Sequence, residues 1–203
     1  MSEIKLQADS GGGTVSWKGP ATTTSDAHVQ FVLPVADGGG GTVLKTDGSG
    51  NLSWIYPAGT GAFRAYRNAG QTIVHDTWDI IEYEAETFDT KSWYDTSTFK
   101  YTPQVAGYYQ FDAGAWLGGV GSDNLELQLS LYKNTTRYSR SNKTDDASYN
   151  NQQGVKIHDV IQLNGSSDYV QVRLLQYNSS SSNRDLSGGS ELNYFSGYLV
   201  EAT

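Results

Sequence analysis

Two histidines stand directly before an aspartate, in His75-Asp76 and His158-Asp159, so each pair sets a potential base beside a carboxylate. General acid–base catalysis needs both groups to converge on one proton. Adjacent side chains of a strand point to opposite faces of a sheet, which separates the two groups. The sequence also has no Gly-x-Ser-x-Gly turn to hold a nucleophilic serine. We therefore expect no catalytic residues and a protein that is not an enzyme.

Oxygen-bearing side chains gather at two places where calcium could be held. Asp145 and Asp146 lie near Asn142 and Asn150, and Asp123 stands before an asparagine. Calcium prefers oxygen ligands, but neither group has the spacing of an EF-hand loop. Acidic side chains in loops are usually solvated. We expect no metal and no cofactor, and calcium binding stays open as the alternative.

Aromatic and arginine side chains in two polar stretches are the candidates for ligand contact. Tyr138, Arg140 and Tyr149 lie in the first stretch, residues 135–153, which we expect to be a long loop. Arg184 lies in the second expected loop, residues 179–190. Tyrosine and arginine in exposed loops offer contact area and adaptable hydrogen bonds to sugars or proteins. The alternative is that these side chains pack against the side of the domain.

Composition favours an all-β fold. Of the 203 residues 12% are aromatic, with 14 tyrosines and 23 glycines, and helix-forming residues never recur with a helical period. Cysteine is absent, which excludes disulfides and cysteine metal sites. The formal net charge of −8 argues against nucleic acid or an anionic membrane as a partner. We expect neither a signal peptide nor a membrane span, because the start of the sequence lacks a basic-then-apolar order and no 18 apolar residues run together.

Alternation of apolar and polar residues predicts the strands of the larger part of the chain. The clearest run is 109–117, where Tyr109 and Phe111 share one face with small and apolar residues. Pro103 and Gly107 bracket the turn before this run, and we expect Gly107 to adopt a positive φ there. Further strands are expected at 63–66, 78–83, 125–131, 169–177 and 193–200.

Three motifs follow one another along this part of the chain. They are Tyr94-Asp95 with Tyr101-Thr102-Pro103 and Gly107-Tyr108-Tyr109-Gln110-Phe111, then Leu131-Tyr132-Lys133-Asn134, and last Phe195-Ser196-Gly197-Tyr198-Leu199. Together they resemble the signature of the complement C1q-like, or TNF-like, jelly-roll family over residues 61–203. Two departures are that Phe99 stands where that family has glycine and that Pro103 comes one place early. The resemblance implies a jelly-roll sandwich in a homotrimer.

The expected last strand has apolar side chains on both faces. Phe195 and Leu199 share one face, and the other carries Tyr194, Tyr198 and Val200. Such a strand in a two-layer sandwich needs cover beyond its own core. In the family that the chain resembles, neighbouring subunits of a trimer give this cover. Tyr194, Tyr198 and Val200 are therefore candidates for the trimer interface.

Residues 1–59 differ from the rest, with three of the four prolines and a recurring glycine-rich turn. The turn occurs at 8–15, 36–43 and 46–54, each time between short β-prone runs, which predicts successive hairpins. A flexible glycine linker is the alternative. Hairpins this poor in apolar residues need partners to be stable. The segment from Phe31 to Trp54 resembles stretches common in bacteriophage fibre and appendage proteins, and no Gly-x-y repeat indicates a collagen stalk.

We therefore predict two domains, a glycine-rich β shaft at 1–59 and a C1q-like jelly-roll knob at 60–203. The expected function is that of a homotrimeric bacteriophage fibre or appendage protein, assembled in the host cytoplasm and located in the virion. Residues 1–59 would contact other virion proteins, and the knob would bind a glycan or protein on the host surface. The alternative is a structural capsid or tail decoration without receptor binding. A surface-glycan hydrolase would need paired carboxylates about 5 to 9.5 Å apart, and the sequence shows no such pair.

Overall fold

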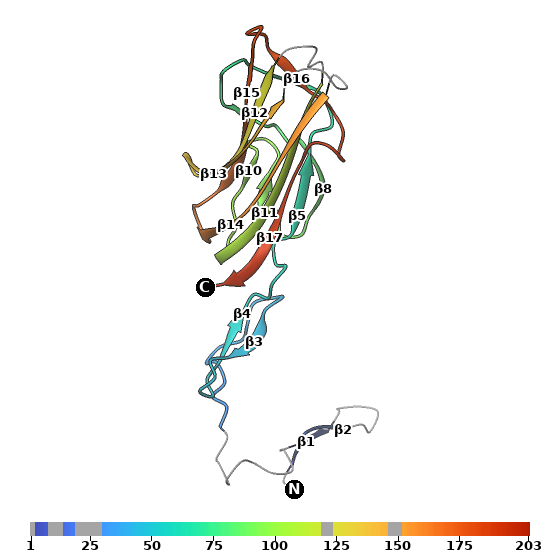
Figure 1. Ribbon diagram of the computed structural model, residues 1–203. Coiled ribbons are helices and arrows are strands. Elements are labelled where there is room, and N and C mark those ends of the chain that lie inside the picture. Colours follow the sequence, from blue (N-terminus) through green and yellow to red (C-terminus); the bar gives the residue numbers. More distant parts are fainter. Residues whose placement is uncertain (1–2, 8–13, 19–29, 119–123, 146–151) are drawn as a thin grey trace. The chain divides into compact units, whose positions relative to one another are not determined.

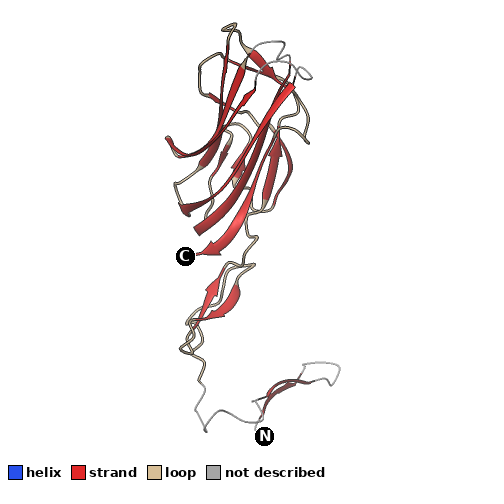
Figure 2. Cartoon of the chain, in the orientation of Figure 1, coloured by secondary structure: helices blue, strands red, loops and turns tan. Residues whose placement is uncertain are grey.

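The computed structural model describes residues 3–7, 14–18, 30–118, 124–145 and 152–203 (Figure 1). Figure 2 shows that the regular elements of these residues are strands, which confirms the all-β class. In the same described ranges, no helix is long and apolar enough to cross a membrane. The chain separates into two compact units, one of residues 1–40 with 44–54 and one of residues 41–43 with 55–203.

Two short sheets lie in the first 55 residues. In the first, β1 (Glu3–Gln7) runs antiparallel to β2 (Thr14–Lys18). In the second, β3 (Val43–Thr46) pairs with β4 (Leu52–Ile55). Both pairs occur beside glycine-rich turns, where the sequence predicts hairpins. That these sheets form a shaft is still a prediction.

Asp47 organises the turn between β3 and β4. Its carboxylate accepts hydrogen bonds from the side-chain amide of Asn51 at 2.7 Å and from the backbone N–H of Ser49 at 2.7 Å. These bonds lower the pKa of Asp47 below its usual range. Gly48 and Gly50 both have positive φ, at 83° and 93°, which explains why glycine recurs in this turn.

Apolar side chains of the described part of the smaller unit are left in contact with solvent. Phe31, Leu33 and Val35 are 62%, 66% and 108% exposed. Isolated two-stranded sheets are at best marginally stable in water. Because these side chains are exposed in the described residues of this unit, they are available to partners.

The larger unit is a sandwich of two antiparallel sheets. One sheet has the order β13-β12-β15-β10-β9, with β7 also paired to β15. The other has the order β6-β16-β11-β17-β5-β8, with β14 also paired to β11. The strands of the first sheet are β7 (Asp79–Ile80), β9 (Tyr94–Asp95), β10 (Lys100–Tyr101), β12 (Leu125–Lys133), β13 (Thr136–Asp145) and β15 (Val170–Asn178). Those of the second are β5 (Phe63–Tyr66), β6 (Gln71–Ile73), β8 (Ala85–Asp89), β11 (Ala106–Gly118), β14 (Gln152–Asn164), β16 (Arg184–Leu186) and β17 (Tyr194–Ala202).

Stacked aromatic rings fill one end of the space between the two sheets. Phe63 stacks on Tyr101 with ring centroids 4.3 Å apart and meets Phe195 edge to face at 4.9 Å. Such pairs add to the stabilisation from burial alone. Tyr101 is fully buried, so its hydroxyl needs a partner, and it donates a hydrogen bond to the carbonyl of Gly61 at 2.7 Å. Burial raises the pKa of Tyr101, which keeps this donor protonated.

The alternating pattern at 125–131 is confirmed, because the leucines of β12 are fully buried and face the core. The pattern at 109–117 is likewise confirmed by β11. The predicted strand at 78–83 is shorter than expected, since only Asp79–Ile80 pairs with β15.

The prediction of a long loop at 135–153 is wrong. Residues 136–145 form β13, and β14 begins at Gln152. β13 pairs with β12 alone and is therefore an edge strand. An edge strand tolerates a polar sequence, which also discourages pairing with other chains. The second expected loop, 179–190, is also interrupted by a strand, β16, at Arg184–Leu186.

The expected positive φ at Gly107 is also wrong, because Gly107 is not among the glycines with positive φ. The left-handed residue of this region is Phe99, with φ at 57°. It is the residue that stands where the resembled family has glycine. Phe99 lies in the turn between β9 and β10, which therefore has a bulky residue in a left-handed conformation.

Candidate ligand-binding site

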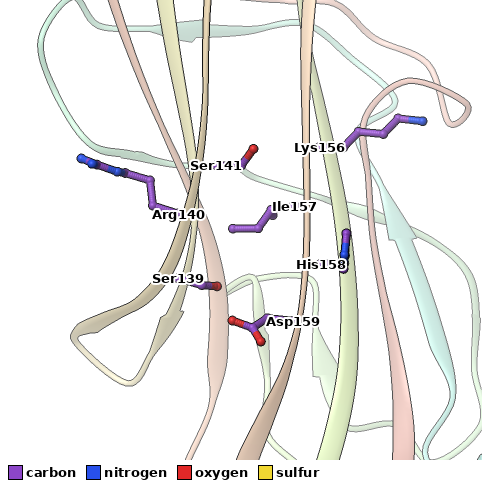
Figure 3. A pocket seen from close by; sticks show the side chains of 7 residues that line it. All are labelled: Ser139, Arg140, Ser141, Lys156, Ile157, His158 and Asp159. Carbon is purple, nitrogen blue, oxygen red and sulfur yellow. The ribbon is translucent and has the colours of Figure 1, made fainter.

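A shallow pocket of about 330 Å³ opens between the edges of the two sheets. β13 is the edge of one sheet, and β14, which pairs only with β11, is an edge of the other. Neither strand has a second pairing neighbour among the described residues, so backbone groups of both are free to meet a ligand or another chain. The lining side chains are Ser139, Arg140, Ser141, Lys156, Ile157, His158 and Asp159 (Figure 3).

The lining side chains do not all point into the pocket. In Figure 3, Ser139, Ile157 and Asp159 turn toward the space between the strands, whereas Arg140 and Lys156 turn away on opposite sides. The hydroxyl of Ser139 is buried, and the described part of the chain gives it no hydrogen-bond partner. A buried hydroxyl without a partner costs stability, so this site favours a ligand that supplies one.

Tyr138 and Arg140, two of the predicted contact residues, lie on β13 rather than in a loop. Tyr138 is 51% exposed, and its hydroxyl is 3.5 Å from the carbonyl of Val160 across the sheet opening. Arg140 is exposed and donates a hydrogen bond to the amide oxygen of Gln128 at 3.1 Å. Both side chains are accessible, and the bond to Gln128 holds Arg140 over the outer face of the sheet.

The other two predicted contact residues are not brought to this site. Tyr149 lies outside the described residues. Arg184 is on β16, opposite Ile73 of β6, and donates a hydrogen bond to the hydroxyl of Ser180 at 3.4 Å. It is therefore half-buried in the sheet that does not contain Tyr138 and Arg140.

The three candidates for a trimer interface all lie on the outer face of β17. Tyr198 and Val200 are exposed, and Tyr194 is half-buried beneath the Arg64 guanidinium, 5.4 Å from its ring. The structure adds two exposed apolar residues of the same face that the sequence analysis missed, Tyr108 on β11 and Val160 on β14. The polar Gln110 lies between Tyr198 and Val160 in the strand register, so the exposed apolar side chains of this face are spread over three strands and alternate with polar ones.

The histidine–aspartate pairs do not assemble an acid–base site in the described structure. His158 lies opposite Asp112 of β11, while its neighbour Asp159 turns toward the pocket. The backbone N–H of Val160 donates to Asp159 at 2.8 Å. The ring of His75 packs against that of Tyr177, with centroids 4.9 Å apart and the ring planes tilted by 35°.

Acidic side chains do not form a metal centre in the part of the chain that the structure describes, since no three His, Cys, Asp or Glu residues gather there. Of the residues considered for calcium, Asp123, Asp146 and Asn150 lie outside the described residues. Asp168 is instead part of a polar cluster with Lys133, at 3.0 Å, and Asn134, at 2.9 Å. Burial opposes ionisation of Asp168, but these two partners outweigh it and lower its pKa.

The comparisons with known proteins agree with this architecture. The model of the C1q domain family matches residues 62–200. Among solved structures, the globular domain of zebrafish complement 1qA protein is 19% identical, with a TM-score of 0.51, and the match covers 71% of this chain and 100% of that one. Murine APRIL is 8% identical, with a TM-score of 0.51 and coverage of 68% and 98%. At these identities the likeness shows the fold. No curated protein matches the sequence.

Proposed function

Because this chain belongs to the C1q domain family, we propose that it acts as a homotrimeric attachment protein of a bacteriophage virion, a fibre or appendage whose C1q domain binds a ligand on the host surface. Domains of this family are binding domains that typically form homotrimers. The observation that carries the proposal is the outer face of β11, β14 and β17, on which Tyr108, Val160, Tyr198 and Val200 are exposed. The open edges of β13 and β14 are the surface that remains for a ligand.

The apolar outer face supports trimer formation. Tyr108, Val160, Tyr198 and Val200 are all exposed on it. Several large apolar side chains exposed on one face, with polar residues around them, are typical of an interaction surface. A second and third copy of the chain are the partners that membership of the family favours.

Residues 1–59 are the proposed link to the virion. Phe31, Leu33 and Val35 are exposed in the smaller unit, which supports contact with other chains. The resemblance of this segment to bacteriophage fibre proteins supports a virion protein as that partner. Removing residues 1–56 should leave a folded trimer that is no longer incorporated into particles. Particles that still contain the shortened chain would contradict the assignment.

The C1q domain is the proposed contact with the host. Three copies that each bind weakly gain roughly 10²–10⁴ in avidity when they engage together. This gain suits attachment through shallow sites such as the pocket between β13 and β14. Tyr138 and Arg140 are the accessible side chains beside that pocket.

A competition experiment tests the proposed function. The purified full chain, added to host cells, should slow adsorption of the parent virions because it occupies the same ligand. Electron microscopy of virions labelled with antibody against the C1q domain should locate the protein at the tip of a fibre or appendage. Label on the particle together with no competition would instead favour the structural decoration.

A further inference from the structure

Three arginines from two different strands gather on the outer face of the β13-β12-β15 sheet. Ser130 and Tyr132 of β12 point away from the core, because the leucines between them point into it. Residues directly opposite in neighbouring strands share a face. Arg140 and Arg173 lie opposite Ser130 on its two sides, and Arg137 lies opposite Tyr132. Neighbouring strands are about 4.8 Å apart, so Arg140 and Arg173 have backbones roughly 10 Å apart.

Two aromatic rings hold two of these arginines in place. The guanidinium carbon of Arg173 is 4.4 Å from the ring centroid of Tyr132, and that of Arg137 is 4.6 Å from the ring centroid of Trp78. The rings of Trp78 and Tyr132 meet edge to face at 6.2 Å. Stacking uses the flat face of a guanidinium and leaves its in-plane N–H donors free. We call Arg137, Arg140, Arg173, Trp78 and Tyr132 the arginine face.

No carboxylate neutralises the arginines of this face within the described residues. Arg67, in contrast, forms ion pairs with Glu82 and Glu84 at 3.2 Å each. The acid on the same face of β12 is Glu126, four residues from Ser130 and therefore about 13 Å along the strand. It accepts a hydrogen bond from the amide of Gln128 at 2.6 Å. The arginine face is thus a local positive surface on a chain of net charge −8.

Two polar atoms beneath the arginine face are buried and have no hydrogen-bond partner among the described residues. They are the hydroxyl of Ser130, a residue with 0% exposure, and Nε of Arg173. Ser130 lies directly opposite Arg173 in the strand register. A buried donor or acceptor without a partner costs about 1–3 kcal/mol. These two groups on adjacent strands add polar character beneath the arginine face.

We propose that the arginine face binds a polysaccharide whose repeating unit carries a carboxylate or phosphate group. This inference rests on the proposed function and names the class of ligand on the host surface. The in-plane N–H groups of a guanidinium donate bidentate hydrogen bonds to the oxygens of a carboxylate or phosphate. The face is an open sheet surface with several cations in sequence, which fits a polymer with repeated charges better than a single small ion. A polymer also engages three copies of the face in a trimer at once.

The second reason for this assignment is that contacts within the protein already order the arginine side chains before a ligand binds. A free arginine loses side-chain freedom when it binds an anion, and that loss weakens binding. Arg173 and Arg137 already stack on rings, and Arg140 is tied to Gln128. Duplex nucleic acid is a poorer partner, because it is an extended polyanion of high charge density and a chain of net charge −8 repels it.

The test is binding of the full chain to alginate, a polysaccharide that carries carboxylates, to phosphomannan, a polysaccharide that carries phosphates, and to uncharged dextran. The parent chain should bind one or both charged polymers, with affinity falling as salt rises, and should not bind dextran. The triple variant Arg137→Gln, Arg140→Gln, Arg173→Gln should lose at least about tenfold in affinity, in line with the typical strength of charged hydrogen bonds. The control variant Lys5→Gln, Lys45→Gln, Lys91→Gln removes the same charge elsewhere and should bind as the parent does.

Two further variants keep the test decisive. Arg140→Gln alone changes an exposed side chain and should weaken binding even where the triple variant fails to fold. The triple Arg→Lys variant keeps the charge and removes the two-pronged geometry, so its affinity should fall between those of the parent and the triple Arg→Gln variant. Absence of binding to both charged polymers, equal binding by the Arg→Gln variants, or equally tight binding to duplex DNA would overturn the proposal.

The failure of this inference is distinguishable from that of the proposed function. If the parent chain and its triple Arg→Gln variant both slow virion adsorption equally, attachment stands and the arginine face is not its site. If the parent chain does not slow adsorption, the proposed function fails. The polymer-binding experiment then still tests the role of the arginine face independently, since it requires no virion.

Discussion

A Cβ atom at position 107 would lie 2.4 Å from the carbonyl oxygen of Glu201 on the neighbouring strand. Gly107 opens β11 opposite Ala202 of β17, beside the register shift between Tyr108 and Tyr109. The same Cβ would lie 2.7 Å from Cδ1 of Leu199, in the core. Glycine is therefore required here by the close approach of two strands, and not by its freedom to adopt a positive φ.

Substitution of Gly107 should destabilise the C1q domain. Gly107→Ala introduces the colliding methyl group, and forcing extra volume into a packed site typically costs about 1–3 kcal/mol. Gly70→Ala is the matched control, because its Cβ would meet the Leu186 carbonyl at an ordinary 3.5 Å. Urea denaturation of both variants measures the difference. A Gly107→Ala variant as stable as Gly70→Ala would show that the strands can separate at little cost.

Phe99 occupies a left-handed position that glycine would take without strain. With φ at 57°, a residue other than glycine costs about 1–2 kcal/mol in backbone energy. Phe99→Gly should therefore be more stable than Phe99→Ala by about 1 kcal/mol, since both variants lose the same ring. The same pair at Thr96, which lacks a positive φ, should give the opposite order. Thermal unfolding compares the four variants, and the same order at both positions would refute a backbone origin.

The stability that ionised Asp95 contributes to the domain should persist down to about pH 4 and decline below it. Its carboxylate accepts hydrogen bonds from the hydroxyl of Ser97 at 2.6 Å and from that of Thr98 at 2.9 Å. With the backbone N–H of Ser97, these bonds hold the pKa of Asp95 at about 2, below its usual 3.8. A lowered pKa contributes stability above pH 3.8 that is lost as the pH falls through 2.

The measurement for Asp95 is the difference in unfolding free energy between the parent and Asp95→Asn from pH 6 to the lowest pH at which the domain stays folded. The parent's advantage should shrink below about pH 4. Ser97→Ala combined with Thr98→Ala removes two donors and should reduce this pH dependence. A difference that stays constant with pH would contradict the role of Asp95.

The sequence predicts the strands that carry a periodic core. The leucines of β12 alternate with polar residues because one face of the strand is buried, and the run beginning at Tyr109 follows the same rule. β13 escapes prediction because an edge strand with a polar sequence has no such alternation. Tyr108 could have been found as a candidate interface residue, since it alternates with the core residues of β11 and is aromatic.

The arginine face depends on register, which the sequence of one strand does not contain. Arg137 and Arg173 are brought together only when β13, β12 and β15 pair in the order and alignment that they have. Trp78 reaches them because β7 pairs with β15. The same applies to the pocket, where Ser139 and Asp159 lie on the edges of different sheets. Cross-strand pairing therefore sets these sites, whereas local pattern sets the strands.

Charge on the apolar outer face should break the trimer. The full chain should have about three times the monomer mass of 22.1 kDa in light scattering. Three copies carry a formal charge of 3 × −8 = −24, so the interface must be apolar enough to overcome their repulsion. Val160→Glu adds a charge to each copy on that face, and burial of this charge should shift the mass to that of a monomer.

Val74→Glu is the matched control for this experiment, because Val74 is also valine and is 42% exposed, as is Val160. It lies between β6 and β7, outside the apolar face of β11, β14 and β17. The control should remain trimeric, and both variants should keep the far-ultraviolet spectrum of the parent. A trimeric Val160→Glu variant, or a parent chain that is monomeric at micromolar concentration, would show that this face does not join the subunits. Loss of the trimer in the Val74→Glu control would place the interface elsewhere on the domain.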